Sequence, residues 1–198
     1  MQAHNRGRPT ARVAAVLAAT ALAATTGLAG SGTALADDLE QTSEEAVAEI
    51  QAQDWPEFSK GDSAIDIRAV KMLLSYIEIN PGEINNEFDE DLEAALISYQ
   101  EAFDLEGNGE LNEETWEDLR DRIFGQAVFG PGSTGPVVEM IQRVLNAKYN
   151  YHLATDGVYG YWTEAAVREV QDQFDIGVDG IFGPLSFEAL ITYQDFDR

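Results

Sequence analysis

The sequence predicts an all-α protein that contains two tandem copies of one three-helix unit. The first observation is an internal repeat: a shift of 71 positions (132 minus 61) aligns residues 61–119 with residues 132–190 without a gap, and 11 aligned pairs are identical. The second is that apolar residues recur at the three-and-four spacing of amphipathic helices. The third is the glycine-rich turn ahead of helix starts, as at Asp156-Gly157 and Asp179-Gly180. A gapless match of this length is typical of a duplicated supersecondary unit.

Residues 1–36 have the pattern of a secretory signal peptide. Three arginines lie before position 13, an uncharged apolar run covers 13–28, and Ala34-Leu35-Ala36 is a small-residue cleavage site. A membrane anchor is the alternative, and it is weaker because the apolar run is short and ends in that site. We therefore expect an exported, secreted protein.

The chain is strongly acidic and has no cysteine, so disulfides cannot stabilise it. Its formal net charge is −24, with 36 acidic residues, and 26 of these acidic residues lie between positions 37 and 125. Such a field repels nucleic acid and anionic membranes, so we expect neither as a partner. A basic secreted protein fits the charge, and a solvated acidic surface without any specific partner is the alternative.

Three segments follow the leader: an acidic lead-in at 37–54, a first module at 55–125 and a second module at 126–198. We expect a loosely packed lead-in with a short helix through Ile50, and attachment of Trp55 and Phe58 to the first module. Ser63 followed by Asp66 resembles a capping box, which would begin a helix. The helices expected are 63–77, 89–103 and 112–123 in the first module, and about 134–149, 162–174 and 184–193 in the second.

The second module contains a long pattern of glycines, apolar residues, glutamines and Asp-Gly turns. Its positions are Gly132, Gly135, Val138, Ile141, Gln142, Asp156, Gly157, Tyr159, Gly160, Thr163, Ala166, Val167, Val170, Gln171, Asp179, Gly180, Phe182, Gly183 and Pro184. This pattern resembles the peptidoglycan-binding domain family of secreted and cell-wall proteins. The resemblance implies three-helix modules that bind peptidoglycan, and therefore a protein associated with the cell wall.

The first module departs from this pattern, and we regard it as a degenerate copy. Asparagine tolerates left-handed turns, so the fold can survive these changes. The surface that the resemblance assigns to the ligand has become acidic, however, which argues against binding there. The replacements are Asn85 and Asn86 for Asp-Gly, Asp89 and Asn112 for glycines, and Glu113 for proline.

A peptidoglycan ligand offers sugar faces, amides, carboxylates and a stem-peptide amine, so its site needs aromatic rings, amide partners and a placed charge. Tyr161 and Trp162 stand where the family has proline and a small residue, which adds aromatic surface. For these two rings, binding and structural roles both stay open. For Tyr159, Phe182 and the aspartates, core and turn roles are favoured. The full candidate ligand-binding set is Asp156, Tyr159, Gly160, Tyr161, Trp162, Asp179 and Phe182.

No catalytic residues, cofactor or resident metal are expected. Residues 104–115 copy much of an EF-hand calcium loop, but Thr115 takes the place of its final Glu, so an acidic turn is the favoured interpretation. His152 is the only histidine after the leader, which leaves zinc and Ser-His-Asp chemistry without a ligand or base set.

We therefore interpret the sequence as a non-catalytic peptidoglycan-binding protein. One alternative is an acidic protein that occupies or inhibits a secreted enzyme. The other alternative is a cell-wall hydrolase whose site has no recognisable signature.

Overall fold

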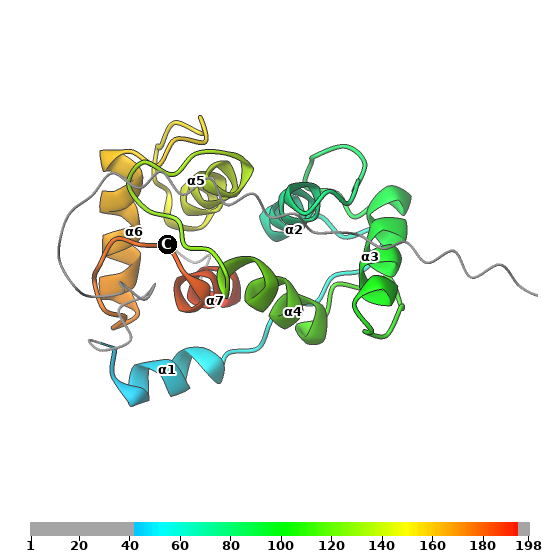
Figure 1. Ribbon diagram of the computed structural model, residues 1–198, viewed down its shortest axis with the longest axis horizontal. Helices are drawn as coiled ribbons and strands as arrows, with labels where there is room; N and C mark the ends of the chain where they lie inside the picture. Colours follow the sequence, from blue (N-terminus) through cyan, green and yellow to red (C-terminus); the bar gives the residue numbers. More distant parts are fainter. Residues whose placement is uncertain (1–41, 194–198) are drawn as a thin grey trace, which may run out of the picture. The chain divides into compact units, whose positions relative to one another are not determined.

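The computed structural model describes residues 42–193, and within them every regular element is a helix (Figure 1). The all-α prediction is confirmed. The predicted signal peptide, residues 1–36, lies outside the described residues, and the predicted domain boundaries stay predictions. The helices are α1 Glu44–Gln51, α2 Ile65–Tyr76, α3 Glu90–Ala102, α4 Glu113–Phe124, α5 Pro136–Tyr149, α6 Tyr161–Gln173 and α7 Pro184–Thr192.

The internal repeat is reproduced helix by helix. The helices α2, α3 and α4 begin at 65, 90 and 113, and α5, α6 and α7 begin 71 residues later, at 136, 161 and 184. The isolated β-bridges repeat at the same offset, because Phe58–Leu111 corresponds to Phe129–Phe182. The two tandem three-helix units are thus one structure built twice.

Local capping determines most helix starts. Asp89 and Asn112 accept hydrogen bonds from the backbone N–H groups of Leu92 and Thr115, at 2.9 and 3.0 Å. At α5 and α7 a glycine stands at the N-cap and a proline opens the helix. Side-chain oxygens or a pre-set proline therefore satisfy or remove the N–H groups that a helix start leaves unpaired.

The predicted capping box at the start of α2 is wrong. The N-cap of α2 is Ala64, and no side chain caps it. The carboxylate of Asp66 instead lies buried and forms an ion pair with Lys148 of α5, 2.9 Å from Nζ to Oδ1. The Asp66 carboxylate therefore pairs with a residue distant in sequence instead of capping the start of α2.

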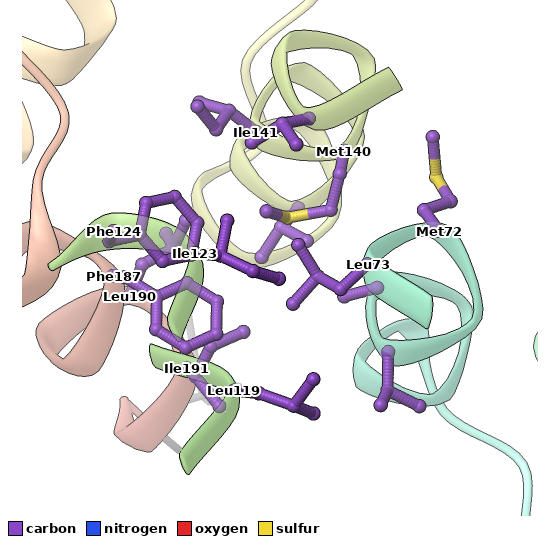
Figure 2. Packing of buried hydrophobic residues seen from close by; sticks show 14 of the residues in the cluster. Met72, Leu73, Leu119, Ile123, Phe124, Met140, Ile141, Phe187, Leu190 and Ile191 are labelled. Atoms are coloured by element: carbon purple, nitrogen blue, oxygen red, sulfur yellow. The ribbon is translucent and has the colours of Figure 1, made fainter. Parts of the chain in front are cut away.

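The two modules share a single hydrophobic core. Helix α2 packs against α5, and α4 packs against α7. Each contact joins a helix to its own repeat equivalent, which is the arrangement of a two-fold symmetric interface. Figure 2 shows the side chains that meet there, among them Leu73 of α2, Leu119 and Ile123 of α4, Met140 and Ile141 of α5, and Phe187, Leu190 and Ile191 of α7.

Trp116 and Phe187 are repeat equivalents, and they lie at the centre of this interface. Their ring centroids are 6.1 Å apart, and both side chains are fully buried. Phe124 of α4 stacks on Phe187 at 4.6 Å. Equivalent residues meet in this way only near a two-fold axis, so the interface is built from matching faces of the two modules.

The lead-in is packed more tightly than predicted. Trp55 is only 6% exposed and stacks on Trp116, with ring centroids 5.9 Å apart. Its ring also lies 6.2 Å from Phe187, so it contacts the second module as well as the first. Helix α1 packs on α7, where Ile50 joins a small apolar cluster with Ile176, Leu185 and Ala189. The expectation of a loosely packed lead-in is wrong because α1 buries Ile50 against α7.

Within residues 42–193, no helix combines the length and the apolar character that a bilayer crossing requires.

Candidate ligand-binding site

A buried glutamine organises the turn that precedes α6. Gln142 of α5 donates from Nε2 to Asp156 Oδ1, to Val158 O and to Thr163 Oγ1, at 3.0 to 3.1 Å. Its Oε1 accepts the backbone N–H of Gly157 at 3.0 Å. Gly157 has a φ of +66°, a conformation in which glycine is not strained. The Gln142 side chain thus links the Asp156-Gly157 turn to the start of α6, and we call this arrangement a glutamine clamp.

The same clamp recurs before α7. Gln171 of α6 donates to Asp179 Oδ1 at 2.8 Å and to Ile181 O at 3.0 Å, and it accepts the N–H of Gly180 at 2.8 Å. Asp179 also accepts the N–H of Ile181 at 2.8 Å. Both aspartates of the candidate set are therefore engaged in turns.

Asp156 is exposed, but its carboxylate is engaged on one side. The backbone N–H of Val158 and the amide of Gln142 donate to it, and together they hold the pKa of Asp156 below its usual value. Hydrogen bonds to the ionised form have this effect. Asp156 thus stays charged at the edge of the turn.

Tyr159 and Phe182 lie in the core, each about 1% exposed. The hydroxyl of Tyr159 donates to the carbonyl of Gly180 at 3.0 Å, which ties the two turns together. Phe182 packs edge-on against Phe124, with centroids 5.7 Å apart. Neither ring presents a face to a ligand, so their contribution to a site is to position the turns.

Tyr161 and Trp162 are by contrast open to solvent, at 72% and 74% exposure. They begin α6 directly after Gly160, the N-cap, where a Cβ would meet nothing within 4 Å. Their rings meet edge to face, with centroids 5.0 Å apart and an interplanar angle of 76°. Large aromatic rings are seldom left this exposed without a role, because their burial is strongly favourable.

Trp162 borders a groove of about 390 Å³ between α6 and the segment that follows α5. One wall is a single face of α6, at the spacing of 0, 3, 4 and 7 residues. The opposite wall is irregular chain. The lining residues are Tyr151, His152, Leu153, Ala154, Trp162, Ala165, Ala166 and Glu169.

Of the residues that line this groove, the candidate set predicted from the sequence contained Trp162 but not Tyr151 or Glu169. The Tyr151 hydroxyl lies beside the Glu169 carboxylate, and burial together with this carboxylate raises the pKa of the hydroxyl. The available signal was the helical spacing of Trp162, Ala165 and Glu169, where a small residue separates a large ring from an acid. The opposite wall could not be found in this way because it has no periodic pattern.

The first module builds the corresponding region differently. Subtracting 71 places Glu90, Asp91 and Ser98 where the second module has Tyr161, Trp162 and Glu169. The backbone of Gly82 lies so close to α3 that an added Cβ would come within 2.6 Å of the Cβ of Asp91. The aromatic rim and the groove acid are thus absent from this copy.

Lys71 occupies the position in the first module that corresponds to Gln142 in the second. Its buried Nζ donates to Glu83 O, Asn85 Oδ1 and Asp89 Oδ2, at 3.1, 3.0 and 2.8 Å. Desolvation raises the pKa of Asp89, but the bond and charge of Lys71 and a bond from the N–H of Leu92 outweigh it, so the pKa is lowered overall. Two of the substitutions in this copy, Asn85 and Asp89, thus supply the partners of a buried lysine.

The segment 104–115, which resembles an EF-hand calcium loop in sequence, forms another such turn, in which Gln100 contacts Asn108 and Gly109. Asn108 Oδ1 accepts the N–H of Glu110 at 2.9 Å and the Nε2 of Gln100 at 3.2 Å. In the part of the chain that the structure describes, no three His, Asp or Glu side chains are grouped to hold a metal ion. The side chain that matches a central calcium ligand is therefore engaged in the turn.

Two fused three-helix units, with a groove and an aromatic rim on one of them, define a small tandem-repeat binding module. A family model for the peptidoglycan binding domain matches residues 63–119 and again residues 134–190. The chain belongs to this family, with two tandem modules. Cell-wall binding is thus the function that its family supports.

Similar curated proteins include enzymes of the bacterial cell wall and spore. The spore cortex-lytic enzyme of Bacillus subtilis (strain 168) is 38% identical over 76 residues, which is 38% of this chain and 25% of that protein. The zinc D-Ala-D-Ala carboxypeptidase of Streptomyces albus G is 38% identical over 69 residues, 33% of this chain and 27% of that protein. The chain thus spans about a quarter of the length of these relatives. No solved structure matches it significantly.

Replacing Gln142 with leucine is expected to lower the free energy of unfolding by about 1–3 kcal/mol, because the buried N–H of Gly157 loses its acceptor. Urea denaturation followed by circular dichroism measures this change. Gln53→Leu, at an exposed position, is the matched control and should stay within about 0.5 kcal/mol. Equal stability of the two variants would contradict the clamp.

Proposed function

We propose that this protein binds peptidoglycan through the second module, and that Tyr161 and Trp162 form the rim of the site. The observation that carries the proposal is the exposure of these two rings beside a groove, in the module that keeps the family pattern. Aromatic faces pack well on the apolar faces of sugar rings. Gly160 leaves the approach to the first turn of α6 unobstructed.

We further propose that the first module supports the second rather than binding a wall ligand itself. Its counterpart of the aromatic rim is acidic, with Glu90 and Asp91 at the start of α3. Its helices complete a core that the second module shares, so it adds buried apolar area. A basic secreted protein as partner stays a prediction that rests on charge alone.

The proposed mode of action is binding without cleavage, by an exported protein. Helices α2 to α7 are all accounted for by the two modules, and the glutamine and aspartate of the repeated turns form hydrogen bonds within those turns. The relatives carry enzyme names, but the matching segments cover about a quarter of each protein. Zymography on gels that contain purified cell wall separates the two modes: a cleared band at the mass of the pure protein would overturn the non-catalytic proposal.

Retention on purified sacculi tests the site. The double variant Tyr161→Ala, Trp162→Ala is expected to weaken binding about 30-fold, since truncating a central aromatic anchor costs about 2 kcal/mol or more. Both rings are exposed, so the fold should be unaffected. Tyr76→Ala, an exposed tyrosine of the first module, is the matched control and should bind as the wild type does. Unchanged retention of the folded double variant would remove these rings from the site.

A further inference from the structure

We propose that the groove of the second module takes the free primary amine of a stem-peptide side chain, with Glu169 as its carboxylate partner. This inference rests on the proposed function and names the part of peptidoglycan that the groove recognises. Trp162 would cover the neighbouring apolar part of the same ligand.

Along one face of α6 the groove has an aromatic residue at one end, two alanines in the middle and an acidic residue at the other end. Trp162, Ala165, Ala166 and Glu169 lie on successive turns of α6. Seven residues of helix place Trp162 and Glu169 about 10 Å apart along the axis. This length suits an alkyl chain that ends in a charged group.

The charges of the groove select a cation. Glu169 is the only carboxylate among the lining residues, and His152 is the only basic side chain there. The Glu169 carboxylate, with the side chain of Tyr151 beside it, is a favourable surrounding for an ammonium group. The net charge of −24 raises the local concentration of cations around the whole chain.

The apolar lining distinguishes a stem-peptide amine from an amine on a sugar. Leu153, Ala154 and the two alanines of α6 offer methyl groups along the path to Glu169. Methylene groups of an amino-acid side chain gain from this contact. An amine attached directly to a sugar ring would bring hydroxyl groups to the same wall, and these would lose hydrogen bonds to water.

The first module keeps the two alanines of the helix face, as Ala94 and Ala95, but lacks the rings and the carboxylate of the groove. The residues that correspond to Tyr151, Trp162 and Glu169 are Asn80, Asp91 and Ser98. We therefore expect the amine to be recognised by the second module alone.

The test uses the full mature chain and lysine-type sacculi, whose stem peptides carry a lysine side chain that ends in a primary amine. Three supports are compared: untreated sacculi, sacculi with their amines N-acetylated, and glycan from which an amidase has removed the stem peptides. Retention is expected to fall about tenfold on each of the last two supports. Equal retention on all three would overturn the amine inference and leave peptidoglycan binding intact. Absence of retention on every support would overturn the proposed function, and the amine inference with it.

Glu169→Gln is expected to bind untreated sacculi about tenfold more weakly and to show no further loss on acetylated sacculi. Asp172→Asn, an exposed acid on the same helix but outside the groove, is the matched control and should keep the preference for untreated sacculi. Circular dichroism confirms the fold of both variants. Equal binding of the two variants would overturn the role of Glu169.

Discussion

Replacing Phe187 with alanine should destabilise both modules together, by about 3–5 kcal/mol in the free energy of unfolding. Phe187 is fully buried, and its ring contacts Trp55, Trp116 and Phe124. All three partners belong to the first module, although Phe187 lies in α7 of the second. Its loss therefore opens a cavity at the centre of the shared core.

Urea denaturation, together with hydrogen exchange of backbone amides, measures this effect. Wild type and variant should each unfold in one transition, and amides of α2 should lose as much protection as those of α5. Tyr161→Ala, an exposed aromatic of the same module, is the control and should change stability by less than about 0.5 kcal/mol. Two separate transitions, with the first module unaffected by Phe187→Ala, would show that the core is not continuous.

Helix positions were predictable because local chemistry determines them. Apolar spacing indicated the helices from α2 to α7. The start of α5 was predicted near residue 134, and the helix begins at Pro136, whose fixed φ suits the first helical position. The prediction failed at Ser63 and Asp66, where the pattern of a cap was present but its carboxylate had a distant partner. A local pattern cannot reveal an ion pair between residues 82 positions apart (148 minus 66).

The fusion of the two modules could not be predicted for a related reason. An apolar stripe on α4 looks the same whether it packs inside its own module or against α7. Trp116 belongs to such a stripe, and only the structure shows that it meets its repeat equivalent, Phe187. The burial of Lys71 could not be predicted either, because a lysine among acidic residues normally lies on the surface.

The candidate site was predictable in part: two of its residues have a recognisable sequence signal, and Glu169 has none. Tyr161 and Trp162 stood out because they depart from the family pattern at a helix start. Glu169 did not, because 36 acids make any one of them inconspicuous. Its position in the groove depends on Tyr151, which lies on a segment without periodicity.

Removing Lys148 alone is expected to cost about 3–5 kcal/mol in the free energy of unfolding. Its side chain is 1% exposed, and that of Asp66 is 3% exposed, so Lys148→Met would leave an unpaired carboxylate in the interface between α2 and α5. Burial raises the pKa of Asp66 and lowers that of Lys148, and each charge opposes the shift of the other. The variant should respond by protonating Asp66, so its deficit should shrink as the pH is lowered toward the raised pKa.

The double variant Asp66→Leu, Lys148→Met separates the cost of burial from the value of the pair. Adding 71 to 66 and subtracting it from 148 gives Val137 and Ile77, so the other half of the pseudo-symmetric interface has an apolar pair in these positions. An apolar pair should therefore fit, and the double variant should be as stable as the wild type or more stable by about 1–4 kcal/mol. Lys148 also donates to Ile191 O at 2.7 Å, and losing this bond offsets part of that gain. A double variant as unstable as Lys148→Met would show that this bond, rather than the ion pair, is what Lys148 contributes.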